Sequence, residues 1–286
     1  MKKLSLLLIS GLLLVGCSSN DYSTQVSENN KTLISGENIS ITKQDYYTYL
    51  MDNYGANEVL KVILTTIADK EVTDQKKIDA LLKEKKETYA KYYDGSLLEY
   101  AQSFGYKDEE EFIENQLLPE VKEELLRNKY IKKNYDQLIN EYQVNRFKQI
   151  IVDKESTALE IIKTSTSTEK FDEQMKKYKD NSEDCGIVTK NTSTIDKNLT
   201  KKLQEFQKIT KDGVYKDAVK LSNDQYAVIY LYDTNRKNKN DYIKALSTDK
   251  DIQNTIESYY LKQYHFEVYD ERLKKSIENI SKDFFE

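Results

Sequence analysis

Most of the chain after the N-terminal segment carries apolar residues at helical spacing, and two short stretches depart from it with the pattern of strands. Residues 39–55 begin with a short extended piece and continue as a helix, for which Thr42 provides the N-cap and Asp45 the acid of a capping box. Residues 56–72 are apolar on nearly all sides, which predicts a central helix. Residues 249–280 return to the helical pattern, so the body of the chain begins and ends in helices.

Further helices are expected between residues 73 and 142. Gly105 ends a short helix that begins near residue 97, because glycine readily takes the left-handed conformation at a helix C-terminus. Asp108 caps the next helix, with Glu111 three positions on. Pro119 has no backbone N–H, so it either kinks this helix or begins a new one within its first turn.

The two short stretches 147–152 (FKQIIV) and 226–232 (YAVIYLY) are rich in β-branched and aromatic residues and predict strands. The helices predicted between them are residues 158–163, 170–178 and 199–209. Residues 181–194 are polar and indicate a loop, with weaker strand signals near residues 187–188 and 213–219. The pattern therefore predicts a small α+β insert between a helical front and a helical back.

The N-terminus has the pattern of a secretory signal, with a cationic start followed by an apolar run over Leu4–Gly16. This run is shorter than the ~20 residues that a spanning helix needs. Its ending, Leu-Val-Gly-Cys, resembles a bacterial lipobox, which implies that Cys17 is lipidated and becomes the new N-terminus. The alternative is an ordinary cleaved signal with an incidental cysteine. Polar residues follow Cys17 and predict a flexible tether.

Composition and the absence of known motifs exclude several folds and classes of function. Eight Gly and one Pro argue against a turn-rich all-β fold. Charged residues make up 33% of the chain with a net charge of −5, and no basic stripe is present, so nucleic-acid binding is not expected. No metal, nucleotide or dinucleotide motif occurs, and we expect no metal and no cofactor. His265 is the one histidine, on a helical pattern where a packed or surface residue is expected. Cys185 has no intrachain partner if Cys17 carries lipid.

Two segments, ITKQDYYTYLMDNYGANEVLKVILTTIADKEV and LLEYAQSFGYKDEEEFIENQLLPEVKEELLRNKYI, together with the tail SIENISKDFF, resemble PrsA-type foldases. These are lipoproteins of Gram-positive bacteria that assist the folding of exported proteins, and they are related to SurA-like proteins. The resemblance implies a mostly helical α+β fold, in which a discontinuous helical chaperone domain carries an inserted parvulin-like domain. The implied parts are a signal peptide (1–16), lipidated Cys and tether (17–32), a SurA-like helical part (33–144), a parvulin-like module (145–236) and a C-terminal helical part (237–286).

The implied module departs from the parvulin pattern at its functional positions. Gln149 and Ala227 stand where parvulins have their two histidines, and Asn181 stands near the cysteine or aspartate of the first loop. Cys185 falls within the reduced glycine-rich turn, as a glycine replacement. Easing a rotation barrier of ~18–20 kcal/mol requires preorganised dipoles, which this chain lacks at those positions. We therefore expect a degenerate module with weak or no isomerase activity.

Tyrosine is the other lead, because the chain has 23 Tyr and no Trp. Tyrosines cluster around residues 46–54 and again around residues 89–106, and each ring offers large, adaptable contact area. Most are expected to be core or half-buried, while some line a client groove. The client-binding candidates are Tyr46, Tyr47, Tyr49, Tyr54, Tyr100, Phe104 and Tyr106.

The leading hypothesis is a membrane-anchored extracytoplasmic chaperone on the outer face of the cytoplasmic membrane. Its partners would be unfolded or partly folded secreted proteins and the membrane, through the lipid, and the family resemblance also makes a homodimer plausible. The alternatives are an active prolyl isomerase, a solute-binding lipoprotein and a surface adhesin. The missing histidines oppose the first, and the scarcity of strands opposes the second.

Overall fold

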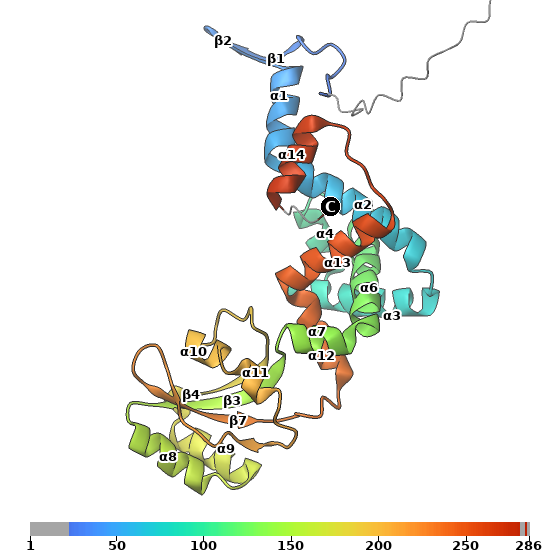
Figure 1. Cartoon of the computed structure of the whole chain (residues 1–286). Coiled ribbons are helices and arrows are strands. Elements are labelled where there is room, and N and C mark those ends of the chain that lie inside the picture. The colour runs from blue at the N-terminus through green and yellow to red at the C-terminus, as the bar shows by residue number, and fades with distance from the viewer. Residues whose placement is uncertain (1–22, 281–283, 285–286) are drawn as a thin grey trace, which may run out of the picture. The chain divides into compact units, whose positions relative to one another are not determined.

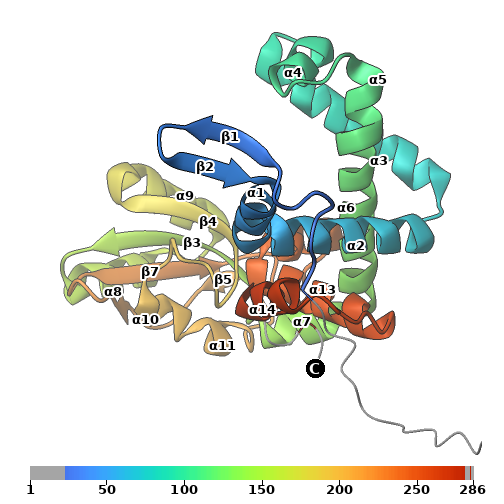
Figure 2. The same cartoon turned by 90° about the horizontal axis from the view of Figure 1, so that it is seen from above.

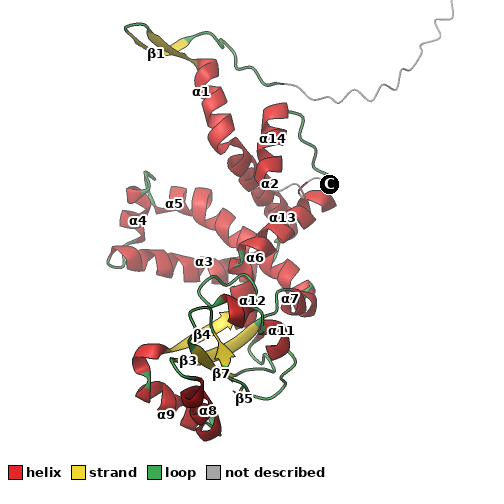
Figure 3. Cartoon of the chain, turned by 60° about the vertical axis from the view of Figure 1, so that its left-hand side comes forward, coloured by secondary structure: helices red, strands yellow, loops and turns green. Residues whose placement is uncertain are grey.

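The computed structural model describes residues 23–280 and residue 284. Helices dominate, and the strands form two small antiparallel sheets (Figure 3). The predicted mostly helical α+β class is therefore confirmed. The predicted signal peptide and Cys17 lie outside the described residues.

The chain divides into two compact units, and the divisions fall inside one helix near each end. We call residues 23–63 with 261–284 the terminal unit and residues 64–260 the central unit. The larger sheet and most of the helices before and after it belong to the central unit. The predicted divisions at residues 144 and 237 do not coincide with these boundaries and stay predictions.

The terminal unit combines a two-stranded ribbon with helices from both ends of the chain. Its elements are β1 (Thr32–Gly36), β2 (Ile39–Thr42), α1 (Lys43–Leu50), the π-helical turn η1 (Met51–Gly55), the start of α2 (Ala56–Glu71), the end of α13 (Lys250–Gln263) and α14 (Glu271–Ile280). The core between them consists of Ala56, Leu60, Leu261, Ile277 and Phe284.

The predicted capping box at the start of α1 is present. Thr42 Oγ1 accepts a hydrogen bond from the backbone N–H of Asp45 at 3.2 Å, and Asp45 Oδ2 accepts one from the N–H of Thr42 at 2.9 Å. The helix predicted over residues 56–72 is present as α2, with Leu60, Ile67 and Ala68 buried, but it is not central on every side, since Val62 is 63% exposed. Branched apolar residues on α2 therefore overstate how much of it lies in the core.

The other helices of the central unit come before and after the sheet module in the chain. They are α3 (Gln75–Ala90), η2 (Lys91–Tyr93), α4 (Leu97–Ser103), α5 (Glu109–Phe112), η3 (Ile113–Leu117), α6 (Leu118–Lys133), α7 (Tyr135–Glu141), α12 (Lys239–Thr248) and the first part of α13. Asp74, Ser96 and Asp108 accept hydrogen bonds from the third residue beyond them and cap three of these helices. A helix starting at residue 73 was expected, and α3 begins two residues later, with Asp74 as its cap.

Pro119 lies in the first turn of α6, directly after the π-helical turn η3. The N–H of Leu118 donates to the carbonyl of Ile113, which is the wider spacing of a π turn. This turn continues the helical path from α5 into α6 without requiring a hydrogen bond from the proline nitrogen. Of the two expected outcomes at Pro119, the structure has the one in which the proline occupies a first turn.

The larger sheet has five antiparallel strands in the order β4-β3-β7-β5, and β6 also pairs with β7. The strands are β3 (Asn145–Val152), β4 (Ser182–Val188), β5 (Gly213–Val214), β6 (Val219–Lys220) and β7 (Tyr226–Leu231). β3 and β7 match the two predicted strands. β4 corrects the loop expected over residues 181–194, because its polar first half pairs with β3 as an edge strand.

Helices cover both faces of this sheet (Figure 1). α8 (Glu155–Thr164) and α9 (Thr168–Lys177) pack on one face, and α10 (Lys197–Thr200) and α11 (Leu203–Phe206) pack on the other. The single helix predicted over residues 199–209 is thus two short ones. The helix predicted over residues 249–280 is also interrupted, since α13 ends at Gln263 and α14 begins at Glu271.

Candidate functional site

The parvulin-like positions Gln149 and Ala227 lie on one face of the sheet. Gln149 is on β3, two residues before Ile151, and Ile151 is paired with Ala227 on β7. Ile151 and Ala227 both belong to the apolar cluster on the face that α10 and α11 cover. Since alternate strand residues share a face, Gln149 lies on that face too. Asn181 is exposed, and it immediately precedes the edge strand β4.

Side chains fill this face. Its buried members include aromatic and aliphatic residues from the sheet, from α10 and α11 and from the loops around them, namely Phe147, Val188, Leu199, Leu203, Phe206, Tyr215, Val219, Leu221, Ile229 and Leu231. Ala227 is 0% exposed and Gln149 is 6% exposed. Gln149 Nε2 donates to Glu183 at 3.3 Å, while its Oε1 is buried without a hydrogen-bond partner among the described residues. Gln149 and Ala227 are therefore both buried on this face.

Cys185 lies at a β-bulge on the edge strand. Phe147 pairs with Gly186 and Lys148 with Asp184, so Cys185 is the extra residue, and Gly186 takes a left-handed conformation with φ of 63°. Burial, followed by the nearby negative charges of Glu183 and Asp184, raises the pKa of the Cys185 thiol to about 12. A thiol with this pKa is protonated at neutral pH, so Cys185 is a poor nucleophile.

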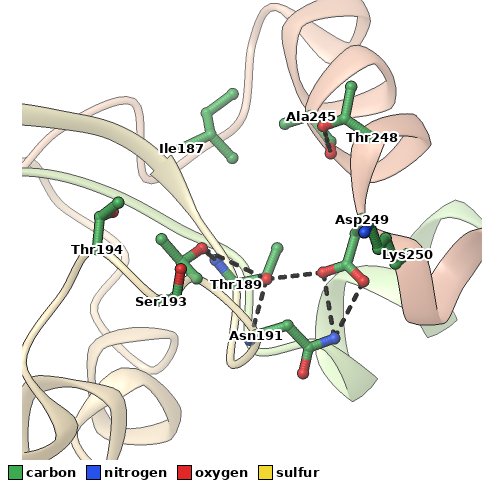
Figure 4. A pocket seen from close by; sticks show the side chains of 10 residues that line it. Ile187, Thr189, Asn191, Ser193, Thr194, Ala245, Thr248, Asp249 and Lys250 are labelled. Atoms are coloured by element: carbon green, nitrogen blue, oxygen red, sulfur yellow. Dashed lines mark hydrogen bonds between the residues drawn. The ribbon is translucent and has the colours of Figure 1, made fainter.

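An open polar pocket of about 350 Å³ lies beside the end of β4, and the junction of α12 and α13 forms one of its walls (Figure 4). Asp249 accepts hydrogen bonds from Thr189 Oγ1 at 2.9 Å and from Asn191 Nδ2 at 3.0 Å. The same carboxylate accepts from the backbone N–H of Asp251 at 3.0 Å and so caps α13. These hydrogen bonds satisfy Asp249 within the protein, which assigns it a structural role.

His265 occupies the turn after α13, not the helical position expected for it. Its backbone φ is 51°, and its N–H donates to the carbonyl of Lys262 at 3.2 Å. The N–H of Phe266 donates to Leu261, which completes a C-terminal helix cap. Among the described residues, no group of three or more His, Cys, Asp and Glu side chains is placed to hold a metal ion.

The predicted aromatic candidates of the central unit are Tyr100 on α4 and Phe104 and Tyr106 directly after it. Tyr100 is the centre of this cluster, and its ring centroid lies 4.9 Å from that of Tyr89, 5.0 Å from that of Phe104 and 5.7 Å from that of Phe112. Tyr92 and Tyr93 add further ring contacts to Tyr100 at 6.0 and 5.7 Å. Tyr106, another candidate, is half-buried against Phe112.

The outer side of this cluster is open to solvent. Tyr92 is 68% exposed and Phe104 is 65% exposed, while Tyr100 between them is half-buried. We call Tyr92, Tyr93, Tyr100 and Phe104 the aromatic patch. Sequence reasoning grouped Tyr92 and Tyr93 with this cluster but left them out of the binding candidates, because nothing in a helical spacing tells which tyrosines of a run face outward.

Charged groups hold the helices that carry the aromatic patch. Lys85 Nζ on α3 lies 2.7 Å from Glu120 and 2.9 Å from Glu124, both on α6. The hydroxyl of Tyr89 donates to Glu120 at 2.9 Å. Burial lowers the pKa of Lys85, but its hydrogen bonds to the two carboxylates outweigh that effect and the net pKa is raised. The lysine therefore stays charged and ties α3 to α6 beneath the patch.

The remaining candidates lie in the terminal unit. Tyr46, Tyr49 and Tyr54 are each more than half exposed, and Tyr47 is half-buried. Tyr49 on α1 and Tyr54 in η1 are five residues apart, which is the spacing that a π-helical turn brings together. The centroids of their rings lie 6.3 Å apart in an edge-to-face arrangement. The predicted tyrosines thus form two groups, one in each unit.

The ribbon of β1 and β2 presents apolar residues that sequence reasoning did not select. Ile34 pairs with Ile41, and Gly36 pairs with Ile39, so the three isoleucines share one face of the ribbon. Ile34 is 63% exposed and Ile39 is 70% exposed. The alternation over residues 39–42 was the signal, together with Asn38 in the turn, which takes the left-handed conformation that asparagine tolerates.

Comparison with known proteins gives similar solved structures but no match among family models or curated proteins. A crystal structure of PrsA from Bacillus subtilis is 24% identical, covers 87% of this chain and 99% of its own, and has a TM-score of 0.42. A peptidylprolyl isomerase (PrsA) from Bacillus cereus is 21% identical, covers 88% and 99%, and has a TM-score of 0.40. The foldase protein PrsA from Streptococcus pneumoniae is 17% identical, covers 88% and 99%, and has a TM-score of 0.36. These are PrsA foldases, the group that the sequence resembles.

Within the described residues, no helix is both long enough and apolar enough to cross a membrane.

Proposed function

We propose that this protein is an extracytoplasmic chaperone that is anchored to the outer face of the membrane by lipid on Cys17 and shields secreted polypeptides before they fold. The observation that carries the proposal is the aromatic patch, in which large rings stay exposed on a scaffold that an ion-pair cluster holds in place. Large aromatic side chains that remain in water are typical of surfaces that bind other molecules.

The chemistry of the patch suits clients of varied sequence. Each aromatic side chain can bury ~150–250 Å² on contact, and the tyrosine hydroxyls tolerate either a polar or an apolar neighbour. The rings of Tyr92, Tyr93 and Phe104 each contact that of Tyr100, with centroids 6.0, 5.7 and 5.0 Å away, so the patch offers several rings to a client. Binding of this kind lowers the concentration of free aggregating chains and needs no chemical step.

We further propose that the sheet module lacks prolyl isomerase activity. The chain has one histidine, and it lies outside the module, while Ala227 lies within an apolar cluster and Gln149 is buried on the same face. In this proposal the helical segments 33–144 and 237–286 bind clients, and the inserted module 145–236 is dispensable for binding. The possible homodimer stays a prediction.

Aggregation of an unfolded secreted protein, followed by light scattering with and without the chain, tests the binding proposal. We expect the wild type to suppress aggregation, and the double variant Tyr92→Ser with Phe104→Ser to lose most of this effect while keeping its circular dichroism. Leu159→Ser is the matched control, because Leu159 on α8 is also exposed, at 50%, but lies far along the chain from the patch. Full suppression by the double variant would exclude the patch as the binding surface.

Two further measurements test the remaining parts. In a proline-peptide assay the chain should leave the exchange near its uncatalysed time of tens of seconds or more, and a rate near that of authentic parvulins would contradict the inactive module. Metabolic labelling with a fatty-acid analogue should mark the wild type and not Cys17→Ser, which should also leave the membrane fraction. Labelling of both proteins would contradict an anchor on Cys17.

A further inference from the structure

We propose that the ribbon of β1 and β2 binds an extended, apolar polypeptide segment by taking it up as an added strand. This inference rests on the proposed chaperone function and names a second kind of contact with the client, through the backbone. The ribbon is the whole of its sheet, so each strand has one neighbour and one outer edge without a strand among the described residues.

The two faces of the ribbon differ sharply. Ile34, Ile39 and Ile41 lie on one face, and Ser35 and Ser40 lie on the other. All three isoleucines are exposed, the least of them by 37%. A ribbon of two strands is only marginally stable in water, and a third strand with an apolar face is what such a sheet needs. The ribbon therefore has one apolar face and lacks a strand to complete it.

The edge of β2 is the better place for an added strand. β1 carries a bulge at Leu33, between the pairs Thr32–Thr42 and Ile34–Ile41, and a bulge disturbs the regular spacing that an incoming strand requires. β2 has no bulge, no proline and no charged residue, and such features are the usual protection of an exposed edge. Glu37 in the turn is the only charge between residues 32 and 42.

These features identify the chemistry of the occupant. Free backbone N–H and C=O groups along an edge fit another extended backbone, and the three isoleucines fit alternate apolar side chains on it. The uncharged edge favours an uncharged segment. A second copy of this chain fits less well, because β1 and β2 contribute five and four residues, while a stable protein interface needs ~20–30 residues from each side.

The test uses the purified full chain and two fluorescent peptides of about seven residues in which Val and Thr alternate. The first has an ordinary backbone, and the second has alternate backbone nitrogens methylated, so its side chains are unchanged but one edge cannot donate hydrogen bonds. In fluorescence anisotropy we expect the first peptide to bind and the second to bind at least about tenfold more weakly, since each net hydrogen bond contributes ~1 kcal/mol and two or three are lost.

Ile39→Lys should weaken binding of the first peptide by a similar factor, because it places a charge on the apolar face and on the edge strand. Thr42 is untouched, so the cap of α1 and the melting temperature should not change. Leu159→Lys is the matched control, with a lysine at an exposed apolar site outside the ribbon, and it should bind like the wild type.

Equal binding of the two peptides, or unchanged binding by Ile39→Lys, would overturn the proposal. A concentration-dependent dimer in the wild type that Ile39→Lys abolishes would also overturn it, in favour of a second copy as the occupant. A wild type that suppresses aggregation but binds neither peptide would refute the ribbon inference and leave the proposed function intact. A wild type that binds the first peptide but does not suppress aggregation would refute the proposed function instead.

Discussion

Replacing Ala227 by histidine tests whether the face of the sheet that α10 and α11 cover has room for a catalytic side chain. Ala227 is fully buried on β7, opposite Ile151 on β3 and Val219 on β6, within the apolar cluster of that face. An imidazole ring at this position must displace packed neighbours, and it brings two ring nitrogens into a cluster made mainly of apolar side chains. We therefore expect Ala227→His to destabilise the central unit and to give no isomerase activity.

The expected loss has two parts. Overpacking a filled core costs ~1–3 kcal/mol. Leaving a buried polar group without a hydrogen bond costs a further ~1–3 kcal/mol. The free energy of unfolding should thus fall by ~2–6 kcal/mol, and in a unit of this size each kcal/mol lowers the melting temperature by ~2–4 °C. The transition of the central unit should therefore move down by roughly 5–20 °C.

The loss should also depend on pH. Burial would hold the pKa of an imidazole at this position below its unfolded value of ~6.5. Below that pH the unfolded chain takes up a proton that the folded chain does not, so unfolding becomes easier as the pH falls. The difference between Ala227→His and the wild type should therefore be larger at pH 5.5 than at pH 8.

Calorimetry and urea unfolding at the two pH values measure these effects, with a proline-peptide assay on the same samples. Leu159→His is the control, because this residue of α8 is half exposed and a histidine there should leave the melting temperature nearly unchanged. If Ala227→His melts like the wild type, and gains isomerase activity when Gln149→His is added, the face is not filled and the reasoning fails.

Three further predictions concern single side chains. Lys85→Met should lower the free energy of unfolding by ~1–3 kcal/mol in a urea titration, because it leaves two half-buried carboxylates of α6 without their cation. Lys129→Met removes a more exposed ion pair and should lower it by under ~1 kcal/mol in the same titration. In Cys17→Ser, the thiol of Cys185 should react far more slowly with an aromatic disulfide at pH 7.5 when folded than in urea, because its pKa is about 12, and equal rates would contradict this. Burial raises the pKa of Glu257, so its charged form is less stable in the folded chain than in the unfolded chain. Glu257→Gln should therefore increase the free energy of unfolding at pH 7, and this increase should vanish as the pH falls towards the unfolded pKa of ~4.3. An increase that persists at pH 4 would contradict this.

The sequence predicted best where a local rule decides the structure. The capping acids Asp45 and Asp108 mark their helix starts, because a cap needs only residues three positions apart. β7 is an apolar run that is buried on both faces of the sheet, and a continuous run of this kind indicates a central strand, while β3 was marked by the β-branched residues at its end. The expected mostly helical α+β class follows from these same elements.

Features that depend on distant partners were predicted poorly. β4 is an edge strand with polar residues in its first half, so its pairing with β3 leaves no alternation to read. Val62 has the side chain of a core residue but not the position of one. His265 takes a left-handed turn conformation that glycine usually supplies, and the surrounding helical spacing concealed the break.

The candidate site shows the same limit. The sequence located Tyr100 and Phe104, and it identified the missing histidines by a simple count. It did not show that Tyr92 is among the most exposed rings, because exposure depends on the turn after η2, where Asp94 and Gly95 adopt positive φ angles. It also passed over the isoleucines of the ribbon, which became visible only through the strand register.

Asp249 couples the local unfolding of two segments of the central unit. One carboxylate holds both the first turn of α13 and the loop that contains Thr189 and Asn191, so neither segment can loosen without releasing the other. In native-state hydrogen exchange the amides of both segments should therefore exchange as one cooperative group, with the same dependence on denaturant. An opening of the Thr189–Asn191 loop would then be transmitted through this carboxylate to the first turn of α13.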